Sequence, residues 1–136
     1  MIETIEHNGK RYAEIIWATV QVEKTTFFSP AESSFQFGLL AHEAGFFEPP
    51  HYHRPFAREI KDLQQMFVVQ RGMVTVQLYT DEGEMFREVT LHPGDAIVLI
   101  HGIHSLRVIE DMQCISVKQG PFLGTDYDKV NVEILK

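Results

Sequence analysis

The chain has 136 residues, of which 44% are hydrophobic and 23% are charged, values typical of a single soluble globular domain. The formal net charge of −7, without clustered Lys and Arg, argues against a nucleic-acid-binding protein, which needs a basic face. No apolar run approaches the roughly 20 residues of a membrane helix, and the start MIETIEHNGKRY lacks the apolar core of a signal peptide. We therefore expect a cytoplasmic protein with no membrane partner.

The single cysteine, Cys114, excludes an intrachain disulfide and is compatible with a reducing compartment. It lies in the apolar alternating run MQCISV. We expect it to be a packed core thiol rather than a nucleophile.

Short apolar runs separated by turn residues predict strands along most of the chain. The expected strands are residues 11–18, 33–42, 66–70, 73–80, 85–91, 96–100, 105–110 and 112–119. Turns are expected at residues 81–84, 92–95 and 101–102, where Gly, Pro, Asp and His gather. This spacing is typical of an all-β sandwich or barrel. Without a repeat or a linker, one domain over residues 1–136 is the simplest organisation.

Two segments depart from the strand pattern. Residues 54–63 are long and charged, and two interpretations remain open: a lid over the site that holds a helical turn, or a solvated connection. The tail ends with alternating Val130, Val132 and Ile134, which predicts an edge strand or packing against a dimer partner.

The central chemical signal is His51-Tyr52-His53. On a strand, residues i and i+2 point to the same side, so two imidazoles would face one cavity. Gln65 follows on the next expected strand, and His104 comes after a later glycine turn. Imidazoles that converge from separate strands suit Zn, Ni, Fe or Cu, and they can equally act as general acid or base near neutral pH.

These residues lie in two segments that resemble the motifs of the cupin family. Gly45-FFEPP-His51-Tyr52-His53 is similar to the start of the first motif, and Gln65-MFVVQR-Gly72 to its end, with Gln where cupins usually have Glu. Residues 93–104, PGDAIVLIHGIH, are similar to the second motif.

The resemblance implies a double-stranded β-helix, or jelly-roll barrel, in one domain, commonly assembled as a homodimer. It also implies that His51, His53, Gln65 and His104 would hold a divalent transition metal such as Zn, Ni, Fe or Mn. A neutral amide is a weaker ligand than a carboxylate, and Glu59 is the nearest acidic residue that would compensate.

The Gln also resembles cupins that isomerise or epimerise nucleotide-linked keto-sugars, often without a metal. The function expected is therefore binding of a small molecule, a carbohydrate or nucleotide-sugar, with isomerase or epimerase activity and with His51 and His53 as catalytic acid and base. Two alternatives remain: a metal-dependent dioxygenase, and a non-catalytic module that binds a sugar or small acid.

The other histidines are expected to be structural or exposed. We expect His42 to pack, His92 to be exposed in its turn, His101 to point outward and His7 to belong to a polar N-terminal segment. A different set of residues is expected to line the barrel: Phe67 and Val69 beside Gln65, with Gln77 and Tyr79 adding polar contacts inside.

Overall fold

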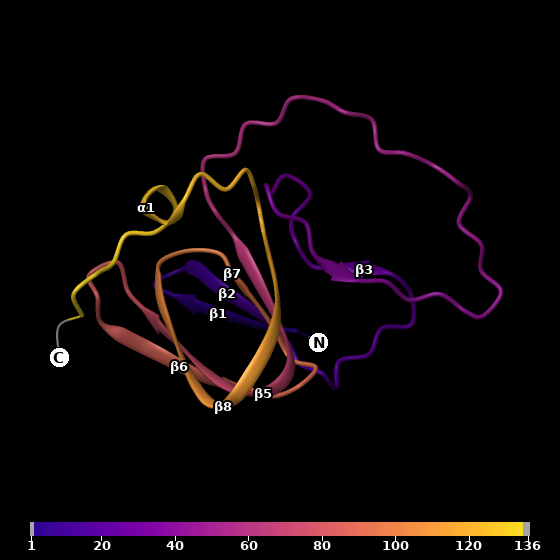
Figure 1. Ribbon diagram of the computed structural model, residues 1–136. Coiled ribbons are helices and arrows are strands. Elements are labelled where there is room, and N and C mark those ends of the chain that lie inside the picture. The colour runs from indigo at the N-terminus through magenta and orange to yellow at the C-terminus, as the bar shows by residue number, and fades with distance from the viewer. Residues whose placement is uncertain (1, 135–136) are drawn as a thin grey trace. The chain divides into compact units, whose positions relative to one another are not determined.

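Antiparallel strands form nearly all of the regular structure in the computed structural model, which describes residues 2–134 (Figure 1). The chain divides into two compact units, residues 1–20 with 64–136, and residues 21–63. The strands and the one short helix are β1 Glu3–His7, β2 Lys10–Ile16, β3 Thr26–Phe27, β4 Gly38–Leu39, β5 Gln65–Tyr79, β6 Met85–Leu91, β7 Ala96–Leu99, β8 Ile103–Lys118 and α1 Thr125–Asp128. No helix among the described residues is long and apolar enough to cross a membrane.

One sheet of six strands makes up the larger unit, in the order β1-β2-β7-β5-β6, with β8 paired to β5. The first part of β5 pairs with β7 and its second part with β6. Along nearly its whole length β5 also pairs with β8, from Gln65 opposite Lys118 to Tyr79 opposite Ile103. The two long strands therefore tie both parts of the sheet together.

The sheet curls because the β5–β8 pairing is interrupted in the middle. Three register shifts fall between Val69 and Val74, and irregularities of this kind bend a strand and increase its twist. Gly72 sits at this place with φ 87°, and a side chain there would overlap the backbone of Asp111 and Met112. Only glycine fits this crossing, and the sheet bends there into a half-barrel (Figure 1).

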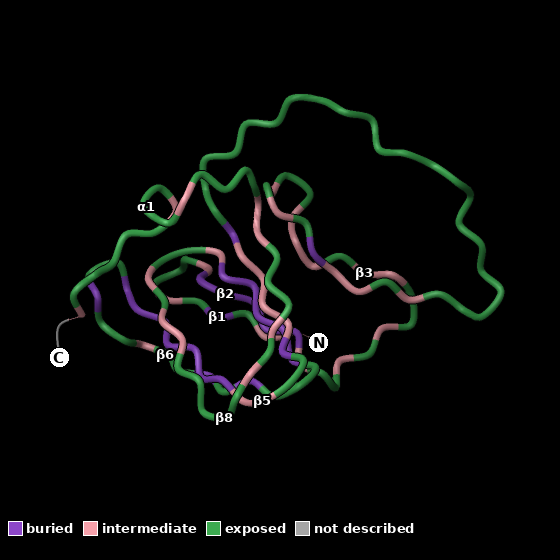
Figure 2. Tube along the Cα trace, viewed as in Figure 1, coloured by how far each residue is buried: buried purple, intermediate pink, exposed green. Residues whose placement is uncertain are grey.

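The concave face of the half-barrel carries the hydrophobic core. The buried cluster is Ile5, Ala13, Ile15, Val69, Val74, Val76, Leu78, Val89, Leu91, Ile97 and Leu99. Figure 2 shows these buried stretches along β2, β5 and β6. The core residues of β5 are odd-numbered up to Val69 and even-numbered from Val74, because the irregular segment between them inverts the alternation of the strand.

The turn at residues 92–95 is fixed by a buried carboxylate. Asp95 is 6% exposed, and its two oxygens accept hydrogen bonds of 2.8 Å from the backbone N–H groups of Ala18 and His92. The backbone of the turn adds a bond from Gly94 N–H to the carbonyl of Val69. Asp95 therefore holds three separate parts of the chain together.

We expect Asp95→Ala to lower the free energy of unfolding by about 2 kcal/mol, because the backbone N–H groups of Ala18 and His92 would lose their buried acceptor. Urea denaturation measures this change. Asp126→Ala, which removes an exposed carboxylate, is the control and should change stability by less than about 0.5 kcal/mol. Equal effects of the two substitutions would contradict the role of Asp95.

Most of the expected strands are confirmed, and 85–91 matches β6 residue for residue. The strands expected at 66–70 and 73–80 are joined in β5, and those at 105–110 and 112–119 in β8. The expectation for 33–42 is reduced to β4. β1, β3 and α1 were not expected.

One local expectation is wrong, and two others lose one of their alternatives. Residues 40–64 contain neither helix nor strand, so His51 and His53 are not on a strand. Residues 54–63 are exposed throughout and hold no helical turn, which matches the alternative of a solvated connection. Residues 129–134 of the tail form no edge strand; Val130 is 87% exposed. Isolated chain segments need partners to become strands, which a pattern of alternation does not supply.

Candidate functional site

The two predicted catalytic histidines, His51 and His53, lie side by side in the smaller unit. Their ring centroids are 5.4 Å apart with the ring planes at 81°. His51 Nδ1 is 2.9 Å from the carbonyl oxygen of Pro49, so this nitrogen carries the proton and donates it. The pair is therefore held together without a strand, in an extended and exposed stretch that begins at Pro49-Pro50.

Gln65 projects from the core face of the larger unit. It pairs with Leu99, a core residue, and residues opposite each other on neighbouring strands share a face. Its Nε2 donates a 2.9 Å hydrogen bond to Ser116 Oγ, which leaves the amide oxygen to act as an acceptor or ligand. Phe67 and Val69 lie on the same face and pack in or against the core, as expected.

His104 projects from the same face at the other end of β8. It pairs with Leu78, which is fully buried in the core. Although the residue is partly open to solvent, desolvation of its ring lowers its pKa, and the positive charge of Lys129 lowers it further. A backbone hydrogen bond with Gly102 acts in the opposite direction but is outweighed. The environment of His104 therefore favours the neutral form of its imidazole.

The tail brings the two ends of β8 into one region. Asp128 accepts a 2.9 Å hydrogen bond from Lys118 Nζ at the end of β8, whereas the next residue, Lys129, lies close enough to His104 at its start to affect its pKa. Consecutive Cα atoms are only about 3.8 Å apart. In Figure 1 both ends of β8 and α1 lie on the same side of the half-barrel.

We call this region the β8-end cluster. It consists of Gln65, His104, Ser116, Lys118, Asp128 and Lys129. It is built within the larger unit alone, from β5, from both ends of β8 and from the tail. Sequence reasoning identified its Gln and His but missed Ser116 and Lys118, although both share the alternation of Cys114. The carboxylate of Asp128 carried no signal in the sequence.

The four residues predicted as metal ligands are divided between the two units. The larger unit holds Gln65 and His104, and the smaller holds His51 and His53. Within residues 2–134, no group of three or more His, Cys, Asp or Glu side chains is arranged to hold a metal ion. The convergence of all four remains a prediction.

Gln77 and Tyr79 are buried, at 7% and 9% exposed, and supply polar contacts. Tyr79 Oη donates to Ser105 Oγ at 2.8 Å, and Ser105 donates to Gln77 Oε1 at 2.8 Å. Gln77 Nε2 then donates to Glu88 at 3.0 Å, which completes a chain across three strands. The inverted alternation beyond Gly72 places this polar chain on the face of β5 opposite to Val76 and Leu78.

The remaining histidines have structural partners or are exposed. His42 stacks on Phe46 with centroids 3.9 Å apart, and His92 is exposed in its turn. His101 Nε2 is 2.9 Å from Asp81 and its ring contacts Tyr12. These neighbours hold the ring of His101 against the end of the sheet.

Cys114 is a partly buried thiol that packs against the core, as expected. Its Sγ is 3.3 Å from Met112 Sδ, and burial raises its pKa. A raised pKa leaves less thiolate at neutral pH, so the environment favours a packing role over a nucleophilic one.

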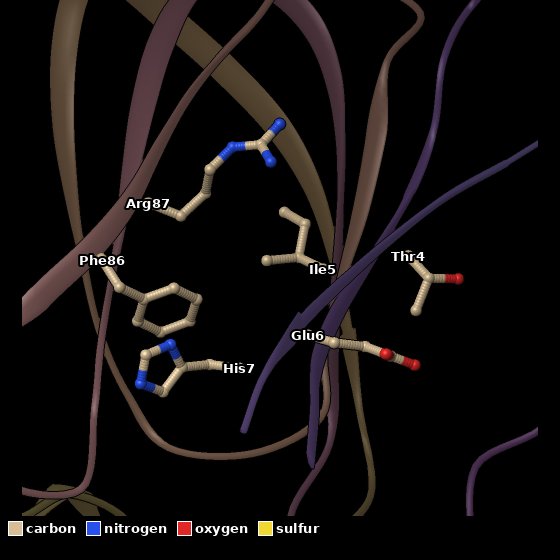
Figure 3. Close-up of a pocket in the computed structure, with 6 residues that line it drawn as sticks. All are labelled: Thr4, Ile5, Glu6, His7, Phe86 and Arg87. Carbon is tan, nitrogen blue, oxygen red and sulfur yellow. The ribbon is translucent and has the colours of Figure 1, made fainter. Parts of the chain in front are cut away.

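A separate open hollow of 710 Å³ lies between β1 and β6 (Figure 3). The close-up shows the rings of His7 and Phe86 beside one another, with centroids 4.7 Å apart. Its lining residues are Thr4, Ile5, Glu6, His7, Phe86 and Arg87. None of the four predicted site residues lines this hollow, so we do not place the chemistry there.

No family model, no curated protein and no solved structure matches this chain.

We expect the pKa of His104 to lie below 6.5, its ordinary value, for the reasons given above. Its contribution to stability should be complete above about pH 6.5 and should be lost as the pH falls through the lower, folded-state pKa. An NMR titration of the imidazole measures the pKa directly. Lys129→Gln should raise it, because one of its two causes is removed. An unshifted pKa in both proteins would contradict the burial of the ring.

Proposed function

We propose that the chain is a small-molecule-binding cupin that isomerises or epimerises a carbohydrate or nucleotide-sugar. The observation that supports this proposal is the β8-end cluster, whose Gln65 and His104 share one face of the curled sheet. An all-β half-barrel with a polar group of this kind at one end suits a ligand site. The motif resemblance supplies the class of substrate.

Closure of the barrel is the second part of the proposal. Among the described residues β8 pairs only with β5, so its other edge is open to further strands. Val108, Ile115 and Val117 on this strand are each between 45% and 49% exposed. We propose that this open edge of β8 accepts a further strand in the complete jelly roll.

The reaction requires a proton to be removed from a carbon next to a carbonyl group and returned to a different carbon or to the opposite face. A neutral imidazole of the His51–His53 pair would take the proton, and the other ring, protonated, would return it. No oxidant or reductant is consumed. Gln65 Nε2 is bound to Ser116, so its oxygen would orient a substrate hydroxyl.

A divalent metal is compatible with the donor set, because the amide oxygen of Gln65 is free of the Ser116 bond and three imidazoles supply nitrogen ligands. Such an ion would be held by His51, His53, Gln65 and His104. When bound, it would supply stabilisation of the negative charge that develops on the carbonyl oxygen.

We expect His53→Ala to reduce turnover of a keto-sugar nucleotide by at least 100-fold with little change in melting temperature, because the ring is exposed and supports no core contact. Exchange of the substrate proton with deuterium from solvent, followed by NMR, measures the reaction. His92→Ala removes an exposed histidine outside the site and is the matched control. Full exchange activity in His53→Ala would remove this residue from the mechanism.

We expect Gln65→Glu to increase affinity for Zn²⁺ or Mn²⁺ at least tenfold, because a carboxylate of the same size replaces a neutral amide. Calorimetric titration of the metal into both proteins measures the change. Gln64 is the residue directly before β5. Gln64→Glu tests whether a negative charge added anywhere nearby raises the metal affinity equally. Metal content of the purified protein, together with activity in its absence, would separate the proposed isomerase from the dioxygenase alternative.

A further inference from the structure

We propose that Lys118 binds an anionic group of the substrate, a carboxylate or a phosphate, and that Asp128 occupies this position in the free protein. Substrate binding would then displace Asp128 and release the C-terminal segment that begins with α1. The inference rests on the proposed function for its site. It assigns Lys118 a role in substrate specificity and Asp128 the role of an internal carboxylate that the substrate displaces.

The position of Lys118 supports this role. It lies directly opposite Gln65 in the β5–β8 pairing, so the two side chains leave the same face of the sheet. The Lys118 side chain is 28% exposed, which leaves its ammonium group within reach of a ligand. Its Nζ also lies 5.1 Å from the centre of the Phe122 ring. The cation is therefore held beside a predicted ligand-binding residue instead of moving freely in solvent.

Asp128 has the chemistry of the ligand that we propose. Its carboxylate accepts a hydrogen bond of 2.9 Å from Lys118, and its side chain is only 15% exposed. A substrate carboxylate or phosphate would make the same charge-assisted contact with Lys118. The carboxylate of Asp128 and the anionic group of the substrate would both bind the ammonium group of Lys118, so they would compete for it.

The segment that carries Asp128 is held weakly enough to be displaced. α1 has four residues, and none of them is buried. Phe122, Leu123, Tyr127 and Val130 are all more than 60% exposed. Segments with few buried contacts open at low free-energy cost. The Lys118–Asp128 pair is thus a main tie between this segment and the sheet.

The local charge favours an anion in spite of the overall charge of −7. Lys118 and Lys129 flank the cluster from β8 and from the tail, and the effect of Lys129 reaches His104. Once Asp128 moves away, Lys118 stays on β8 without its internal carboxylate partner, whereas Lys129 leaves with the tail. A neutral sugar would gain nothing from this arrangement, whereas an acidic sugar or a sugar phosphate would.

The test uses Asp128→Asn and Lys118→Gln in the full chain, titrated with inorganic phosphate and separately with acetate at constant ionic strength. Amide NMR shifts around residues 116–118 report binding, and proteolysis after residue 120 reports release of the tail. Phosphate should bind Asp128→Asn at least fivefold more tightly than the unmodified chain, and Lys118→Gln should lose binding. Lys118→Arg keeps the charge and should retain it. The response to acetate compared with phosphate decides which anion the position takes.

Equal phosphate affinity in the unmodified chain and in Asp128→Asn would overturn the competition. Unchanged affinity in Lys118→Gln would overturn the assignment of the cation. Asp126→Asn removes a neighbouring exposed carboxylate and controls for general charge. None of these measurements needs turnover, and His53→Ala should bind phosphate normally. Failure of the proposed isomerase would therefore be seen separately from failure of this inference.

Discussion

The close crossing of β5 and β8 at Gly72 is the constraint on which the rest of the structure depends. A glycine with positive φ lets the two backbones meet where a side chain would overlap Asp111. Both long strands bend at this place, and the sheet curls around its core. The curl then returns the end of β8 towards its start. Gln65 and His104 keep the same face of the sheet on either side of this bend.

The same irregularity explains which expectations succeeded. Strand existence depends on local alternation of apolar and polar residues, so β2, β6 and β7 were predictable from their own segments. The face that each side chain takes depends on continuous alternation, which the crossing interrupts. Gln65 and Phe67 come before the crossing, and both side chains lie on the face that was expected for them. Gln77 comes after it, on the face of β5 opposite to Val76 and Leu78, and is buried there.

Contacts between distant segments were beyond prediction for a related reason. The pattern of residues 112–119 predicted a strand but not its partner, so nothing placed Lys118 opposite Gln65. The pairing of Asp128 with Lys118 depends on how the tail folds back, and four residues of helix have no strong signal. For His51 and His53 the sequence predicted proximity of the rings correctly, but for a strand that the structure does not contain.

The pairing of β5 with β8 also determines when the sheet can be completed during protein synthesis. Gln65 pairs with Lys118, and the pairing closes over all of the chain between them. β6 and β7 can pair with one edge of β5 as they emerge, but the other edge has no partner until β8 has left the ribosome. Until then the nascent chain presents a long open strand edge, the kind of feature that favours aggregation or chaperone binding. A ribosome that pauses before residue 118 would hold the protein in that state, whatever the stability of the finished sheet.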